Sequence, residues 1–94
     1  MQINQNYKKD LLEVLVGIAD LELMDAFLHD LLTPGEYSDI ITRLQIVRQL
    51  DAKVPQREIA QNLGVSISKV TRGSRELLNV HGGFRKILDQ HQTH

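Results

Sequence analysis

The sequence predicts an all-α protein. Apolar residues recur at helical spacing along most of the chain, helix-starting residues precede several of these stretches, and no stretch alternates polar and apolar residues as a strand would. No internal repeat or low-complexity segment interrupts the pattern. We therefore expect a single domain over residues 1–94, with core helices in 1–54, a pair of short helices in 55–78, and a break followed by a short helix in 79–94.

The first two predicted helices are strongly apolar. Residues 11–19 place apolar side chains on more than one helix face, and residues 21–32, LELMDAFLHDLL, place Leu21, Met24, Phe27, Leu28 and Leu31 at helical spacing. A chain of this length buries only about two thirds of its unfolded surface. These helices carry more apolar surface than the chain itself would cover, so we expect an intertwined homodimer.

A clear start signature opens the third predicted helix. Thr33 is placed as N-cap, Pro34 as the first helical residue, and Glu36 as the partner that completes a capping box. The helix should run to about Asp51. Its apolar positions form one stripe and leave Arg43 and Arg48 near the edges or on the outer face; the stripe consists of Ile40, Ile41, Leu44, Val47 and Leu50.

The most informative segment is residues 56–72, QREIAQNLGVSISKVTR. Gly64 is suited to end a first helix with a positive φ, and Ser66 is suited to cap a second helix from about Ile67 to Leu78. Ala60 would let the two helices cross closely, and Pro55 is placed in the first turn. The inward-facing apolar groups would be Ile59, Leu63, Val65 and Val70. This pattern is typical of a helix-turn-helix that reads double-stranded DNA, with an ordinary αα-hairpin as the alternative.

Beyond this pair of helices, residues 79–83 form a break in which Gly82 and Gly83 stop regular structure. The segment FRKILDQH, residues 84–91, can form a last short helix. Its apolar contacts would come from Phe84, Ile87 and Leu88.

Charge is unevenly distributed although the net charge is only −1. Residues 1–33 hold two lysines against six acidic residues, whereas residues 55–80 hold four basic residues against two acidic ones. The predicted DNA-facing part is thus positive and the N-terminal part acidic, as expected if the latter faces away from phosphate.

No feature of the sequence suggests secretion, membrane insertion or catalysis. Cysteine is absent, which excludes disulfides and cysteine-based zinc sites, and no apolar run reaches the length of a signal peptide or a membrane span. We expect a cytoplasmic protein without a membrane partner. The histidines form no recognisable metal-ligand pattern, and no nucleophile–base pair or phosphate-binding glycine loop is present, so we expect neither a metal site nor an enzyme. These histidines are His29, His81, His91 and His94.

Taken together in order and spacing, several segments resemble the bacterial tryptophan repressor family. They are LLTPGE at 31–36, Arg43 and Ile46 in the long helix, and QREIAQNLGVSISKVTRGS at 56–74, and the resemblance extends over roughly residues 21–78. It implies a DNA-binding repressor that acts as an intertwined homodimer and takes L-tryptophan as corepressor, with palindromic operators of tryptophan biosynthesis or uptake genes as targets.

The resemblance also implies ligand contacts. Arg43 and Arg72 would lie on either side of the indole, and Arg72 would pair with the ligand's carboxylate. Thr33 would give a hydroxyl to the carboxylate, Leu32 would line the pocket and accept from the ammonium, and Gly73 would give the ring room. Glu76 stands near the place of the ammonium, where the family leads one to expect a serine. An arginine pair suits such a ligand, since a guanidinium both stacks on an aromatic ring and forks onto a carboxylate.

For DNA, the resemblance and the helix-turn-helix geometry give two sets of contacts. Base edges in the major groove would meet Ile67, Ser68 and Lys69 at the start of the second helix, and Arg57 could reach a guanine. Phosphates would be met by Gln56, Thr71, Ser74 and Arg75.

Two other functions remain open at this stage. One is a helix-turn-helix regulator that needs no ligand or senses another indole compound. The other is a helical protein-interaction module without a nucleic acid partner, whose binding to duplex DNA would show no sequence preference and little change with salt.

Overall fold

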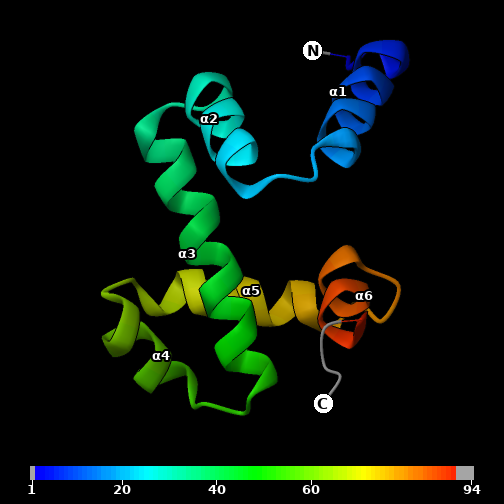
Figure 1. Cartoon of the computed structure of the whole chain (residues 1–94). Coiled ribbons are helices and arrows are strands. Elements are labelled where there is room, and N and C mark those ends of the chain that lie inside the picture. The colour runs from blue at the N-terminus through cyan, green and yellow to red at the C-terminus, as the bar shows by residue number, and fades with distance from the viewer. Residues whose placement is uncertain (1, 91–94) are drawn as a thin grey trace. The chain divides into compact units, whose positions relative to one another are not determined.

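The computed structural model describes residues 2–90, and within them every regular element is an α-helix, which confirms the predicted class (Figure 1). The helices are α1 (Gln5–Gly17), α2 (Leu21–Leu31), α3 (Pro34–Asp51), α4 (Gln56–Leu63), α5 (Ile67–Leu78) and α6 (Gly83–Gln90). The chain divides into two compact units, residues 1–37 and 38–94, which we describe separately. None of these helices combines the length and apolarity needed to cross a bilayer.

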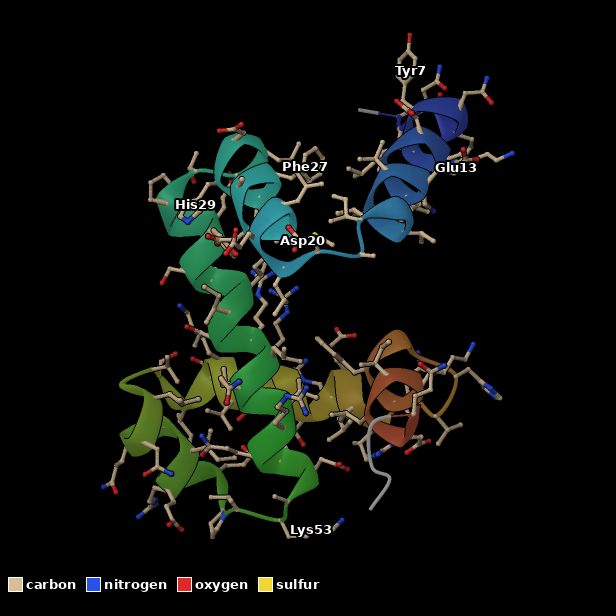
Figure 2. All side chains as sticks on the ribbon, in the orientation of Figure 1. Tyr7, Glu13, Asp20, Phe27, His29 and Lys53 are labelled. Atoms are coloured by element: carbon tan, nitrogen blue, oxygen red, sulfur yellow. The ribbon has the colours of Figure 1, made fainter. Side chains whose placement is uncertain are left out.

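Side-chain caps begin both helices that lie wholly in the first unit. Asn4 Oδ1 accepts hydrogen bonds from the amides of Asn6 and Tyr7, at 2.9 and 3.2 Å, and Asp20 Oδ2 accepts from the Leu23 amide at 2.9 Å. Figure 2 shows Asp20 at the start of α2. α1 ends at Gly17, so the last residues of the predicted stretch, Ile18 and Ala19, lie beyond the helix.

The predicted capping box at the start of α3 is confirmed. The Glu36 amide donates to Thr33 Oγ1 at 3.1 Å, and the Thr33 amide donates back to Glu36 Oε1 at 2.9 Å. These bonds satisfy two amides that a helix start would otherwise leave free. The hydrogen bond from the Thr33 backbone stabilises the ionised carboxylate and lowers the pKa of Glu36.

A small polar cluster joins α2 to the first turn of α3. The Tyr37 hydroxyl donates to Asp25 Oδ1 at 2.8 Å, which raises the pKa of Tyr37, and its ring meets His29 edge-on with centroids 4.9 Å apart. His29 Nε2 also lies 3.3 Å from Asp25 Oδ1. The corner between the two helices is therefore fixed by side chains as well as by the backbone.

Most apolar side chains of α1 and α2 lie exposed within this chain. Neither helix contains a buried residue. Val16 and Leu21 are 86% and 88% exposed, and Leu11, Leu12, Val14, Leu23 and Leu31 are also exposed. The expected surplus of apolar surface in the N-terminal helices is thus present.

In the second unit, the connection between α3 and α4 turns sharply at Lys53. This residue adopts a left-handed conformation with φ of 68°, and Figure 2 places it at the bend. The Lys53 amide donates to the Leu50 carbonyl and the Val54 amide to the Gln49 carbonyl, both at 3.0 Å, so these two carbonyls in the last turn of α3 are satisfied. Pro55, expected in the first turn of α4, instead occupies the N-cap position just before it.

The turn between α4 and α5 has the predicted chemistry. Gly64 ends α4 with φ of 64° and ψ of 39°, a conformation that suits glycine because it lacks a Cβ. The Val65 amide donates to the Ala60 carbonyl at 3.1 Å, and Ser66 Oγ caps α5 by accepting from the Lys69 amide at 3.3 Å. The predicted span of the second helix, Ile67 to Leu78, is confirmed.

Three helices share one core in this unit. Ile46 of α3, Ile59 of α4 and Val70 of α5 are 2%, 0% and 0% exposed and contact one another. Because all three side chains are branched aliphatics with little conformational freedom to lose, their packing fixes α4 and α5 against α3. Partly buried residues surround them, namely Leu50, Val54, Ala60, Leu63 and Val65.

α6 is held by apolar and ionic contacts. Its Leu88 is 4% exposed, and the Arg85 guanidinium lies 2.9 Å from both Asp51 Oδ1 of α3 and Asp89 Oδ1 of its own helix. The helix begins at Gly83, so this glycine starts the helix instead of preventing it. His91, which we expected at the helix end, lies outside the described residues.

Candidate functional site

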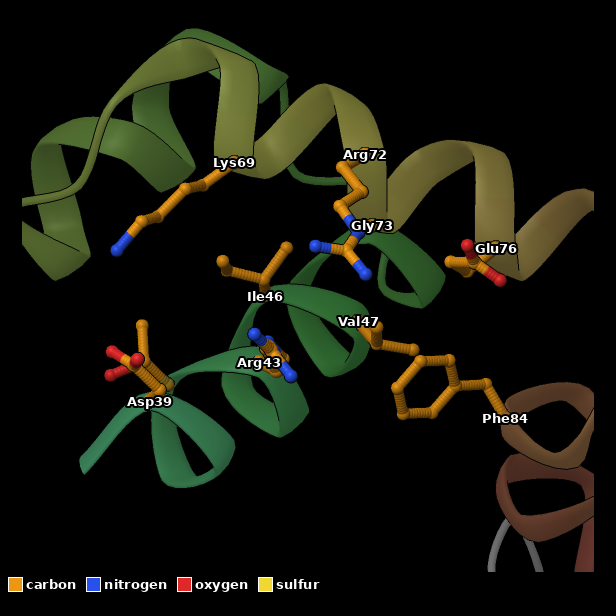
Figure 3. A pocket seen from close by; sticks show the side chains of 10 residues that line it. Asp39, Arg43, Ile46, Val47, Lys69, Arg72, Gly73, Glu76 and Phe84 are labelled. Carbon is orange, nitrogen blue, oxygen red and sulfur yellow. The ribbon is translucent and has the colours of Figure 1, made fainter. Parts of the chain in front are cut away.

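The second unit contains a pocket between α3, α5 and α6, with a volume of about 320 Å³ (Figure 3). This volume lies at the lower end of the range of about 300–1,000 Å³ that is usual for small-molecule sites. α3 contributes Asp39, Thr42, Arg43, Ile46 and Val47, α5 contributes Lys69, Arg72, Gly73 and Glu76, and α6 contributes Phe84.

Charged side chains of both signs line this pocket. Arg43 and Arg72 lie in its middle, between Lys69 and Asp39 on one side and Glu76 and Phe84 on the other (Figure 3). Within residues 2–90, none of these charged side chains makes an ion pair or a side-chain hydrogen bond. The pocket therefore presents uncompensated cations and anions to whatever enters it.

Arg72 and Glu76 are a notable case, because residues four apart on a helix are neighbours and opposite charges there usually attract. No contact within 4.0 Å joins them in the structure. Both side chains instead line the pocket. An arginine preceding an acidic residue is the weaker of the two orders, which leaves both groups available to a ligand.

The floor of the pocket is apolar and closely packed. Ile46 and Val47 are 2% and 1% exposed. A Cβ built on Gly73 would lie 2.8 Å from Ile46 Cγ2 and 3.5 Å from Leu50 Cδ1, so the absent side chain of this glycine lets α5 approach α3. Gly73 also forms part of the pocket wall, where we expected it to give an aromatic ring room.

The structure brings four of the six predicted ligand residues together. Arg43, Arg72, Gly73 and Glu76 all line the pocket. The other two belong to the first unit, where Leu32 is the half-buried C-cap of α2 and Thr33 caps α3. Their contact with a ligand stays a prediction.

Other pocket residues were not predicted as ligand contacts. Lys69 was expected only at DNA, yet it lines the pocket. Asp39 lies one turn before Arg43 on α3, so helical spacing from the arginine could have indicated it. Nothing in the sequence indicated Phe84, because it reaches the pocket from a separate helix.

The predicted DNA contacts lie on α4 and along α5. Ile67, Ser68 and Lys69 are exposed in its first turn, and Arg57 is exposed in α4. The half-buried side chains of Thr71 and Gln56 are linked across the two helices, with Thr71 Oγ1 donating to Gln56 Oε1 at 3.0 Å. Farther along α5, Ser74 is half-buried and Arg75 is exposed.

Comparison with known proteins supports the resemblance seen in the sequence. Residues 6–92 match the family described as Trp repressor protein. Three similar relatives are each named Trp operon repressor homolog. The protein from Mannheimia succiniciproducens is 50% identical over 65% of this chain and 61% of its own length. The protein from Haemophilus influenzae is 46% identical over 69% and 65%. The protein from Chlamydia caviae is 40% identical over 90% and 85%.

The chain thus spans less than two thirds of the Mannheimia and Haemophilus relatives but most of the Chlamydia relative. No solved structure matches it. Because the family match covers nearly all described residues, the chain belongs to the Trp repressor family, a family of transcriptional regulators and not of enzymes.

Proposed function

We propose that this protein is a transcriptional repressor that binds operator DNA as a homodimer and requires L-tryptophan as corepressor. The observation that supports this proposal most strongly is that α5 contributes both to the surface expected to read DNA and to the lining of the pocket. Its first turn exposes Ile67, Ser68 and Lys69, while Arg72, Gly73 and Glu76 on the same helix line the pocket. A ligand in the pocket would therefore contact the helix that reads DNA.

The two arginines fit an aromatic amino acid. The planar guanidinium of Arg43, on α3, would stack on one face of the indole, and that of Arg72, on α5, would cover the other face and pair with the carboxylate. Lysine would do neither well, since its ammonium is a compact point charge. Thr33 and Leu32 would complete the site through a hydroxyl and a backbone carbonyl.

Glu76 fits the ammonium of such a ligand. Cβ atoms four residues apart on a helix are about 5–6 Å from each other. An α-amino acid carries its carboxylate and ammonium on one carbon, so it can span Arg72 and Glu76. We therefore expect the site to prefer the zwitterion over indole compounds that lack the amino group.

Replacing Glu76 with glutamine tests this preference. Loss of a charge-assisted hydrogen bond should weaken L-tryptophan binding about tenfold, while indole-3-propionate, which has no ammonium, should bind as well as before or better. Isothermal titration calorimetry on both ligands measures the ratio of affinities. Asp39→Asn removes one negative charge from the other end of the pocket and should preserve the ratio of the two affinities. If both variants lost L-tryptophan affinity to the same extent, a specific role for Glu76 would be refuted.

DNA recognition would use α4 and α5 as a helix-turn-helix. Ile67, Ser68 and Lys69 would face base edges, with Arg57 placed to reach a guanine. Phosphates would be met by Gln56, Thr71, Ser74 and Arg75, and the hydrogen bond between Thr71 and Gln56 would orient those two side chains together.

Dimerisation would place two helix-turn-helices, one from each subunit, at a fixed separation. The exposed apolar side chains of α1 and α2 are the surface that a second copy would cover. Two copies of α5 would then enter successive major grooves, about 34 Å apart on one face of the duplex. L-tryptophan would favour the arrangement in which both copies fit, because it binds that arrangement more tightly than the others.

The experiment that tests the function is a fluorescence anisotropy titration with a palindromic duplex selected from a random pool by the protein and L-tryptophan. Affinity should rise with L-tryptophan and fall steeply as salt is increased. Equal affinity with and without L-tryptophan would support a ligand-independent or other-indole regulator. Weak, salt-insensitive binding without sequence preference would support an interaction module.

A further inference from the structure

We propose that α6 forms a third wall of the ligand pocket. Its Phe84 is a specificity-determining contact for the ligand's aromatic ring, and Arg85 positions Phe84. The inference deepens the proposed function, because it takes an aromatic amino acid as the ligand. It does not require that the ligand control DNA binding.

Phe84 is the one aromatic side chain among the residues that line the pocket. It is half-buried, and in Figure 3 its ring points from α6 toward Val47 on the pocket floor. The rest of the floor is aliphatic, formed by Ile46 and Val47, and the remaining lining is polar or charged apart from Gly73. A ligand ring that rests on this floor therefore meets an aromatic side chain on one side only.

An aromatic side chain in the pocket wall favours a ligand that also has an aromatic ring. Aromatic pairs prefer offset or edge-to-face arrangements and gain affinity beyond the area that they bury. Phe84 lies on the same side of the pocket as Glu76 (Figure 3). The ring contact and the ammonium contact would therefore both come from this side, which restricts how an aromatic amino acid can be oriented.

Arg85 determines where Phe84 lies. It is the next residue along α6, and its guanidinium bridges to Asp51 Oδ1 on α3 at 2.9 Å and to Asp89 Oδ1 within α6. The side chains of Arg85 and Asp51 are only 24% and 16% exposed, so solvent weakens this pair less than an open surface pair. α3 also supplies the pocket floor, so the bridge holds Phe84 in register with Val47.

The backbone before α6 supports the same placement. The Gly82 amide donates to the Asn79 carbonyl at 2.9 Å, and Leu88 of α6 is buried. α5 and α6 also contact each other directly. α6 is thus fixed at its start, at Arg85 and at its apolar face, and Phe84 is presented from a rigid element.

Calorimetry with L-tryptophan on the full chain tests the contact. Phe84→Ala should weaken binding at least about tenfold, and Phe84→Leu, which keeps most of the apolar volume but removes the ring, by about threefold. Ile87→Ala is the matched control, because Ile87 is 45% exposed on the same helix and does not line the pocket. Unchanged affinity in both Phe84 variants would overturn the proposal.

The positioning role of Arg85 needs a readout that simple destabilisation would not move. Arg85→Met should weaken L-tryptophan binding in the wild-type background but add little in the Phe84→Ala background, because the contact that Arg85 positions is then already gone. Lys86 is an exposed neighbour without an ion pair in the described chain, so Lys86→Met should leave L-tryptophan affinity unchanged in both backgrounds. Equal losses from Arg85→Met in both backgrounds would refute positioning.

These outcomes are distinct from failure of the proposed function. Wild-type protein that does not bind L-tryptophan would refute the corepressor itself. Wild-type protein that binds it with an affinity insensitive to Phe84 would refute the third wall alone. Thermal unfolding of each variant without ligand confirms that the measured protein is folded, and the milder Phe84→Leu variant keeps the test of the ring contact available if Phe84→Ala does not fold.

Discussion

Replacing Arg72 with methionine is expected to remove L-tryptophan-dependent DNA binding. Arg72 lines the middle of the pocket and has no ion-pair partner in the described part of the chain, so a ligand carboxylate would be its main counter-charge. Loss of a fork of charge-assisted hydrogen bonds costs about 2–3 kcal/mol, which corresponds to about 30- to 150-fold in ligand affinity. Calorimetry measures the loss of L-tryptophan affinity, and anisotropy with duplex DNA measures the loss of DNA binding.

Arg48→Met is the control for this prediction. Arg48 is an exposed arginine on α3 that does not line the pocket, so its replacement removes one positive charge from the same unit without touching the site. It should leave L-tryptophan affinity within about twofold of wild type, as is usual for surface positions. If Arg72→Met bound L-tryptophan as well as Arg48→Met does, the pocket would not be the ligand site.

Replacing Ile59 with alanine is expected to be the most destabilising single change in the second unit. Ile59 is fully buried between Ile46 and Val70, so the smaller side chain leaves a cavity where three helices meet. Truncations of this kind cost about 2–5 kcal/mol, a large part of the about 5–15 kcal/mol that stabilises a typical domain. Urea unfolding at a fixed protein concentration measures the change in the free energy of unfolding.

The matched control uses the same substitution at an exposed site. Ile67 is 49% exposed in the first turn of α5, so Ile67→Ala should change stability by no more than about 1 kcal/mol. It should nevertheless weaken binding to the selected duplex, because the proposed function places Ile67 at base edges. Equal losses of stability in the two variants would contradict the burial pattern on which the arrangement of α4 and α5 depends.

The helix boundaries could be predicted well because they depend on local chemistry. The capping box of Thr33 and Glu36, the left-handed Gly64 and the N-cap Ser66 each act within a few residues of the helix end that they fix. Pro55 was misplaced by one position, because proline fits both the N-cap and the first turn and only the surrounding backbone decides between them.

The pocket could be predicted only in part because its walls come from separate helices. Arg43, Arg72, Gly73 and Glu76, which line it, were expected from the resemblance to the Trp repressor family. Phe84 was not, because its place depends on how α6 packs in the unit, through contacts with α5 and the long-range pair between Arg85 and Asp51.

Gly73 illustrates the same limit. The resemblance implied that this glycine gives the ligand's ring room, although glycine is costly inside a helix. Nothing in the sequence indicated that Ile46 of α3 also lies close, 2.8 Å from where a Cβ would be. The close crossing of α3 and α5 at this point is a property of tertiary packing.

We propose that a ligand beneath α5 controls how the protein binds DNA. The decisive measurement is the affinity of the wild-type chain for its selected palindromic duplex at one salt concentration, with saturating L-tryptophan and with none. We expect at least about tenfold tighter binding with the ligand, equivalent to about 1.4 kcal/mol of coupling. Affinities that agree within error under the two conditions would contradict it.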